Sequence, residues 1–224
     1  MGSQARAVPS GRPPRALAGE VEARILDAAR RAFLERGLAG ASVDEIAELA
    51  RAGKPTIYAR FPSKEALFAA VLMHNVSTNI ARFQADEATG ATIEERLASV
   101  GKAALHRALT EDNVGLMRLV IAEAGRFPDL ANKFDQMARE RGSDAVARLL
   151  AEAAQSHGLT KLPAFAPKHL QTTTRMFLDL VFLPIMMRAL LGEKLKPLRA
   201  EIAPHVARTI TFFLAACRLG GIKS

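Results

Sequence analysis

Apolar residues recur every three or four positions along nearly the whole chain from Glu20 onward, which is the period of an α-helix. The first run begins near Val21 and ends at Gly37, a residue that commonly stops helices. No alternating pattern of useful length predicts a β-strand. The pattern therefore predicts an all-α fold of about nine helices. After the first run, the expected helices span 42–50, 54–60, 64–83, 92–109, 112–126, 128–157, 168–191 and 198–219.

Several polar residues and one proline mark where these helices should start. Ser42 with Glu45 and Thr92 with Glu95 have the three-residue spacing of a capping box, in which each side chain binds the other residue's backbone N–H. Pro128 suits the first turn of a helix, where its missing N–H costs nothing.

The chain divides into three parts by composition. Residues 1–19 are rich in Gly, Pro, Ser and Arg and lack apolar periodicity, which predicts a disordered arm. Residues 20–66 contain mostly short helices and form a first domain. Residues 67–224 contain longer helices and form a second domain, large enough to bury a core of its own.

Net charge and cysteine content narrow the function. The formal net charge is +8 and the pI is about 10.1, which favours a polyanionic partner, nucleic acid before anionic membrane. Cys217 is the only cysteine, so the chain suits a reducing compartment and a cytoplasmic location, and the residue itself suits a buried position. The longest apolar run, 176–191, contains Asp179, Pro184 and Arg188 and is too short to span a bilayer.

Signals for catalysis and for metal binding are missing from the sequence. The histidines do not combine with acids or the cysteine at metal-ligand spacing. We find neither a phosphate-cradling glycine loop nor the glycine-flanked serine of a nucleophile turn. The sequence therefore predicts no metal, no cofactor and no enzymatic activity. The histidines are His74, His106, His157, His169 and His205.

The most unusual surface segment is 51–64, which carries basic residues and no acid until Glu65. Tyr58, the only tyrosine, lies among them. Such a segment suits contact with phosphates, because an acid there would repel them. The alternative is a solvated basic face on an ordinary helical bundle.

The order of helices around this segment supports nucleic-acid binding. The expected helices 42–50 and 54–60 are joined by about three residues, as in a helix-turn-helix. The second helix of such a pair enters the major groove by its N-terminal residues. In this chain Tyr58 and Lys64 would then donate to flanking phosphates. The candidate DNA-binding residues are Ser42, Arg51, Lys54, Pro55, Thr56, Tyr58, Arg60 and Lys64.

Residues 25–72, "ILDAARRAFLERGLAGASVDEIAELARAGKPTIYARFPSKEALFAAVL", resemble the DNA-binding domain of TetR-type transcriptional regulators. The shared features are "A-x-x-x-F-x-x-x-G", "S-V-x-x-I-A", "T-I-Y-x-R-F" and "S-K-E-x-L". The family's turn usually reads Ala-Gly-Val-Ser, whereas this chain has Ala50-Arg51-Ala52-Gly53, so Arg51 replaces the turn glycine. The resemblance implies a homodimer that represses by occupying a pseudo-palindromic operator and is released by a small molecule. Arg12 and Arg15 belong either to a minor-groove arm or to an unstructured tail.

Residues 116–134, "LMRLVIAEAGRFPDLANKF", resemble the ligand domain of an AefR-like branch of the family. This resemblance implies that helices 168–191 and 198–219 form the dimer interface. Their composition agrees, because these helices carry more apolar residues than the exposed face of a monomer should. The residues expected at the interface are Leu178, Val181, Phe182, Ile185, Met186, Phe212, Phe213 and Leu214.

A pocket for a small, largely apolar effector is expected among helices 64–84, 92–109, 112–126, 128–157 and 168–191. The apolar candidates, for which plain core is the alternative, are Phe83, Leu105, Met117, Phe134, Met137, Met176 and Phe177. The polar candidates are His106, Asn113, Arg175 and Asp179. The last two lie four residues apart, so an ion pair between them is the alternative to ligand binding.

Together these features predict a dimeric, ligand-responsive DNA-binding regulator, with repression as the expected direction. Three other functions remain open from the residues. The chain could be a small-molecule carrier that has lost DNA binding, which the altered turn at 51–53 would support. It could be an enzyme that uses the cavity, or a protein of the membrane surface.

Overall fold

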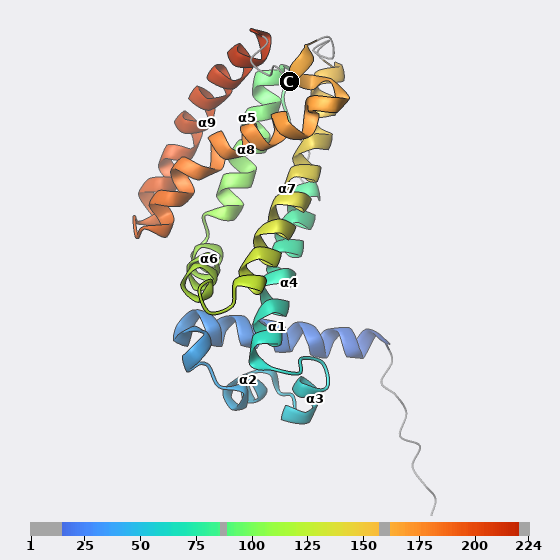
Figure 1. Ribbon diagram of the computed structural model, residues 1–224, viewed down its shortest axis with the longest axis vertical. Helices are drawn as coiled ribbons and strands as arrows, with labels where there is room; N and C mark the ends of the chain where they lie inside the picture. Colours follow the sequence, from blue (N-terminus) through green and yellow to red (C-terminus); the bar gives the residue numbers. More distant parts are fainter. Residues whose placement is uncertain (1–14, 86–88, 157–161, 220–224) are drawn as a thin grey trace, which may run out of the picture. The chain divides into compact units, whose positions relative to one another are not determined.

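The computed structural model describes residues 15–85, 89–156 and 162–219. Within these ranges the chain forms nine α-helices and one short 3-10 helix, and no strand (Figure 1). The all-α prediction is confirmed. The chain divides into two compact units, Met1–Val71 and Leu72–Ser224. The helices are α1 (Arg15–Gly40), α2 (Val43–Ala50), α3 (Lys54–Tyr58), α4 (Lys64–Ala85), α5 (Ile93–Ala108), α6 (Glu111–Glu123), α7 (Pro128–Ser156), η2 (Pro163–Phe165), α8 (Pro167–Leu190) and α9 (Leu195–Arg218).

The first helix starts earlier than the sequence pattern indicated. Helix α1 begins at Arg15, inside the segment expected to be a disordered arm, because the residues from there to Glu20 include the helix-favouring alanines. Arg12 and the side chain of Arg15 lie outside the described residues. Gly37 has a φ of 69° and a ψ of 175°, so the regular helix breaks there, as expected.

The core of the first unit draws on all four of its helices. The rings of Phe33 and Phe68 meet edge to face with centroids 5.2 Å apart. Because Leu67, Phe68 and Val71 are buried, the first turns of α4 belong to this unit. The first unit consequently ends after Val71 rather than at residue 66, where the composition changes.

The two capping boxes expected from the sequence differ in outcome. Ser42 does cap α2, but its hydroxyl accepts from the N–H of Asp44 rather than from that of Glu45. The Glu45 carboxylate instead binds Arg36 at 2.9 Å, so the box predicted at Ser42 is wrong. The box formed by Thr92 and Glu95 at the start of α5 has both of its hydrogen bonds, and its backbone donors lower the pKa of Glu95.

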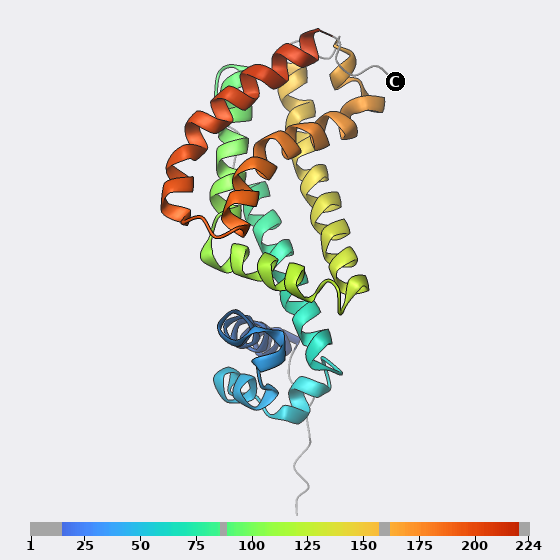
Figure 2. The ribbon, with the colours of Figure 1, turned by 60° about the vertical axis from the view of Figure 1, so that its left-hand side comes forward.

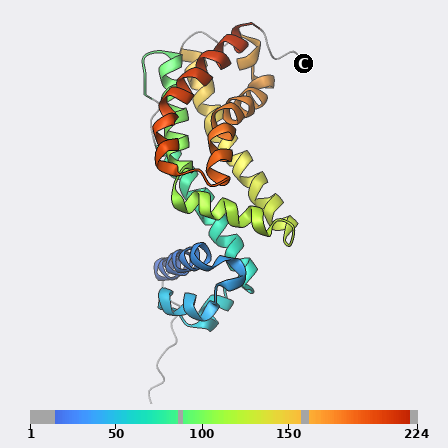
Figure 3. The same ribbon diagram turned by 90° about the vertical axis from the view of Figure 1, so that its left-hand side faces the viewer.

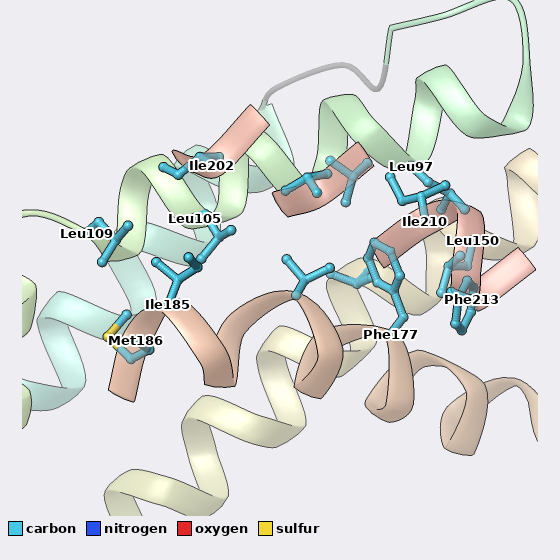
Figure 4. Close-up of a cluster of buried hydrophobic side chains, with 14 of the residues drawn as sticks. Leu97, Leu105, Leu109, Leu150, Phe177, Ile185, Met186, Ile202, Ile210 and Phe213 are labelled. Atoms are coloured by element: carbon cyan, nitrogen blue, oxygen red, sulfur yellow. The ribbon is translucent and has the colours of Figure 1, made fainter. Parts of the chain in front are cut away.

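In the second unit, α8 and α9 run side by side and are joined by a short connection (Figure 2). Helix α6 lies crosswise to the long helices (Figure 3). The main core fills the space between α5, α8 and α9 (Figure 4). Gly101 permits the close approach of α5 and α9, because a Cβ at this position would lie 3.1 Å from Cγ1 of Val206. Cys217 is buried in this core, and burial raises the pKa of its thiol to about 11.

Two arginines fasten the start and the middle of α6 to its neighbours. Arg118, on α6, donates to the carbonyl oxygens of Ala189 and Leu190 at the end of α8. Arg199, on α9, donates twice to the carbonyl oxygen of Leu109, just before α6 begins. The position of α6 therefore depends on charged hydrogen bonds as well as on packing.

Across the described ranges, no helix has both the length and the apolar character needed to cross a membrane. Helix α8 contains the longest apolar run of the sequence, and its residues divide between the core and an exposed face.

Candidate nucleic-acid interface and cavity

Arg51 adopts the backbone conformation that the tight turn between α2 and α3 requires. Its φ of 49° and ψ of 47° are left-handed, and among the described non-glycine residues it alone has a positive φ. The N–H groups of Arg51 and Ala52 bond back to the carbonyl oxygens of Glu48 and Ala47. Gly53 then takes an extended conformation and begins α3. The helix-turn-helix geometry is thus retained although arginine occupies the glycine position.

We predict that Arg51→Gly stabilises the protein. A side chain in the left-handed region costs about 1 kcal/mol, which glycine avoids. Urea unfolding at a fixed protein concentration should show a gain of about 1 kcal/mol in the free energy of unfolding. Arg51→Ala keeps the strain and removes the charge, so it should leave stability within ~0.5 kcal/mol. Equal gains in the free energy of unfolding from both substitutions would mean that removing the positive charge of Arg51 stabilises the protein, and that backbone strain is not the cause.

The candidate DNA-binding side chains share the outer surface around α3. Lys54, Pro55 and Tyr58 are exposed, whereas Ile57 anchors the helix in the core. Ser42 and Arg51 are exposed on the preceding elements, and the three remaining candidates are half-buried: Thr56, Arg60 and Lys64. The first turn of α3 therefore presents to solvent the residues that the sequence predicts to contact the edges of DNA bases.

Several cations of this surface already have partners within the chain. The ammonium of Lys54 pairs with Asp44 of α2. This acid lies outside the segment 51–64, so the charge pattern of that segment does not show it. Both side chains are about half exposed, so water screens the pair and a phosphate can replace the carboxylate. Lys64 donates to the carbonyl oxygens of Ala39 and Ala41, at 3.0 and 3.1 Å. An ammonium has three protons, so Lys64 keeps one for another acceptor.

The second unit contains a cavity of about 250 Å³ between α4, α5, α6, α7 and α8. Met117, Phe134 and Asn113 line it, as the sequence indicated for a pocket. Asn75 and Asn79 also line it, although sequence reasoning missed them. Their spacing of four residues on one helix was the available signal.

The other pocket candidates do not line this cavity. Leu105 and Phe177 are fully buried in the main core, where the Phe177 ring packs against Phe213 with centroids 5.3 Å apart. Helical periodicity cannot distinguish a side chain facing the core from one facing a cavity, which explains these errors. His106, Arg175, Met176 and Asp179 are exposed, Met137 is half-buried outside the cavity lining, and the Phe83 side chain lies outside the described residues.

The ion pair considered between Arg175 and Asp179 is not formed in the described part of the chain. Both residues lie on the exposed side of α8. Asp179 instead acts weakly on Arg139, whose pKa is raised mainly by Asp135. Asp179 and Met176 border a surface groove between α8 and α9, separate from the cavity.

Most side chains expected at a dimer interface point elsewhere. Val181, Ile185, Met186, Phe213 and Leu214 are buried within the chain. Leu178 and Phe182 line the cavity, and only Phe212 is exposed, by 66%. A different row, four residues of α8 and the capping residue after it, faces outward at spacings of three and four residues. We call it the α8 stripe: Met176, Leu180, Leu183, Met187 and Leu191.

Known proteins share both halves of this architecture. Residues 25–71 match the family of bacterial regulatory proteins called tetR, and residues 95–218 match the C-terminal domain of AefR-like transcriptional repressors. The HTH-type transcriptional repressor Rv3405c of Mycobacterium tuberculosis is 33% identical over 144 residues, which are 64% of this chain and 70% of that protein.

Solved structures show the same fold. A protein of Mesorhizobium loti assigned to the TetR family superposes with a TM-score of 0.75 at 24% identity, covering 89% of this chain and 97% of that one. The flavonoid-responsive regulator FrrA is 29% identical, with a TM-score of 0.61 and coverage of 88% and 97%.

The helix-turn-helix followed by an all-helical domain defines a DNA-binding transcription regulator, a class distinct from enzymes. The chain belongs to the TetR family of bacterial regulatory proteins, with a C-terminal domain of the AefR-like type.

Proposed function

We propose that this chain is a dimeric repressor that occupies a pseudo-palindromic operator and leaves it when a small, largely apolar molecule fills the cavity of the second unit. Each protomer would contribute one helix-turn-helix, so that the two-fold symmetry of the protein matches that of the DNA. Since the DNA of a bacterium lies in its cytoplasm, we also propose a cytoplasmic location.

The observation that carries DNA binding is the turn at Arg51 together with the exposed start of α3. The left-handed turn leaves Lys54 and Pro55 exposed, with Tyr58 exposed at the end of the same short helix. The basic groups around them suit phosphates, which supply much of the affinity and set the register on the duplex. Because the tight turn forms although arginine occupies the glycine position, the altered sequence at 51–53 no longer favours a carrier that has lost DNA binding.

The observation that supports a dimer is the α8 stripe. Leu183 is 54% exposed and Met187 is 49% exposed, within a row of five apolar side chains. A continuous apolar row of this kind typically marks a protein interface. On α9, Phe212 and Ala216 border the same groove as Met176 and Leu180 of the stripe, so the apolar surface continues onto α9. A second copy of this chain is therefore the occupant we propose.

The cavity supports the response to a small molecule. Its lining is mostly apolar with a few polar side chains, which is typical of sites for small organic ligands. FrrA, which is 29% identical to this chain, is flavonoid-responsive. This supports, for the present chain, an effector that is likewise organic and able to enter an apolar cavity.

Salt dependence of DNA binding tests the proposed function. With three or four cationic contacts per protomer, a dimer releases enough counterions that log K should fall against log salt with a slope of roughly −5 to −7. Fluorescence anisotropy of a labelled duplex, titrated between low and high salt, measures this slope. Absence of binding at low salt would rule out DNA binding and favour the carrier, and a slope near zero would rule out the proposed phosphate contacts.

A further inference from the structure

Three asparagines form the uncharged polar part of the cavity wall. Asn75 and Asn79 lie one turn apart on α4, and Asn113 lies in the first turn of α6. The side-chain oxygen of Asn113 accepts from Nδ2 of Asn75 at 2.8 Å and from Nδ2 of Asn79 at 3.1 Å. All three residues line the cavity, so any molecule inside it meets this amide cluster.

The orientation of the amide groups follows from one backbone carbonyl. Nδ2 of Asn113 donates to the carbonyl oxygen of Arg107, which can only accept. Oδ1 of Asn113 must therefore face α4, so Asn75 and Asn79 must each present an N–H to it. Their own Oδ1 atoms point to no donor among the hydrogen bonds of the described residues, which leaves both oxygens available to a ligand.

These two amides set the chemistry of the ligand. Each keeps an acceptor oxygen and one N–H, and a hydroxyl group is able both to donate and to accept. Leaving such groups unmet in a partly buried site is unfavourable, so a ligand that meets them gains affinity. Apart from Arg107, the remaining wall is apolar, with Phe134 and Phe182 among its side chains.

Charged ligands fit this wall poorly. No acidic side chain is among the described residues that line the cavity, so a cation would lack a counter-charge. The one charged side chain there, Arg107, donates to the carbonyl oxygen of Arg82. A carboxylate can only accept hydrogen bonds, so it would leave the oxygens of Asn75 and Asn79 unmet. Together with the volume of about 250 Å³, these features suit a small uncharged molecule.

We propose that Asn75 and Asn79 bind the hydroxyl group of an uncharged, otherwise apolar ring compound. This inference rests on the proposed function of the cavity as the effector site. It also assigns the hydroxyl a role in the response, because the same amides hold Asn113. An amide that turns to meet the hydroxyl also shifts its bond to Asn113 and thereby changes the link between α4 and the start of α6, whereas an apolar molecule only fills space.

The test uses the full-length protein and four probes that share one ring system: 2-naphthol, naphthalene, 2-methoxynaphthalene and 2-naphthoate. Calorimetry or ligand fluorescence gives the dissociation constants without DNA. We expect wild-type protein to bind 2-naphthol roughly tenfold more tightly than naphthalene. The methoxy compound can accept but cannot donate, so its affinity should fall between those of naphthalene and 2-naphthol, and the anionic naphthoate should bind less tightly than 2-naphthol.

The variant Asn75→Leu/Asn79→Leu replaces both amides with apolar groups of similar size. It should abolish the preference for 2-naphthol while retaining naphthalene. Met117→Leu is the matched control, since it alters the wall without touching the amides and should change both affinities alike. If circular dichroism shows that the double variant is unfolded, the single variants Asn75→Ala and Asn79→Ala replace it. Each should lose part of the preference for 2-naphthol.

Equal binding of 2-naphthol and naphthalene by wild-type protein, tighter binding of 2-naphthoate, or no binding of any neutral probe would overturn the inference. These results are separable from the repressor function, which is measured on DNA. A hydroxyl preference that depends on the asparagines but leaves operator affinity unchanged would support the site and contradict release by ligand. Intact operator binding with no neutral probe bound would contradict the ligand site and leave DNA binding by the repressor standing.

Discussion

Leu183→Glu should convert the protein into a monomer and remove tight operator binding. Leu183 is the central residue of the α8 stripe and is 54% exposed within a single chain. Across a two-fold interface the substitution would bury two carboxylates without partners. We expect the dimer dissociation constant to rise by on the order of 100-fold or more. Sedimentation equilibrium measures that constant, and anisotropy measures the accompanying loss of DNA affinity.

Ile121→Glu provides the matched control for this prediction. Ile121 is also an exposed aliphatic residue, at 59%, but it lies on α6 and outside the α8 stripe. This variant should remain dimeric and keep its DNA affinity. A Leu183→Glu protein that stays dimeric at micromolar concentration would show that another surface pairs the chains. Monomers from both variants would point to general destabilisation instead.

The double variant Lys54→Gln/Tyr58→Phe should weaken operator binding by roughly 100-fold to 1000-fold. A dimer would lose four hydrogen-bond contacts, each worth about 1 kcal/mol. Neither side chain supports the core, since Lys54 and Tyr58 are about half exposed, so the fold should be unaffected. Anisotropy titrations on one operator duplex at fixed salt measure the loss.

The two single variants separate charge from hydrogen bonding. Lys54→Gln should reduce the salt slope by about 2, one phosphate contact per protomer, while Tyr58→Phe should lower affinity with the slope unchanged. Lys133→Gln, on the exposed surface of α7, makes the same charge change and should alter neither quantity appreciably. Unchanged affinity in Lys54→Gln would refute its assigned contact.

Lys64 is less suited to this test although the sequence singled it out equally. Its ammonium holds the carbonyl oxygens of Ala39 and Ala41, so replacing it also removes two hydrogen bonds from the end of α1. Lost DNA binding in a Lys64 variant would mix a phosphate contact with a structural change. A spatial contact between residues so distant in sequence could not be read from periodicity or local charge.

The sequence predicted the helices well because their signals are local. Helix starts at Thr92 and Pro128 follow from capping chemistry and from proline geometry. The turn at Arg51 was also foreseeable as a left-handed position, since the family resemblance marks it as a glycine site. At Ser42 the local signal failed, because Arg36 of another helix takes the Glu45 carboxylate.

The cavity and the outward face of α8 could be predicted only in part. Helix α8 is apolar on more than one side, so periodicity does not show whether Phe177, Phe182 or Leu183 faces the core, the cavity or the surface. The amide cluster depends on residues from two helices meeting, which sequence spacing alone does not specify. Asn113 was recognised as a polar residue in an apolar segment, whereas its partners on α4 were not.

Selection of operator DNA from a randomised duplex library tests the central claim most directly. Full-length dimer should enrich, over successive rounds, a pseudo-palindromic sequence whose half-sites lie about one helical turn or more apart. Binding to that duplex should be salt-sensitive and should exceed binding to scrambled DNA by at least about 1000-fold. Salt-sensitive binding without any enriched sequence would contradict an operator-specific repressor and would leave only a basic surface.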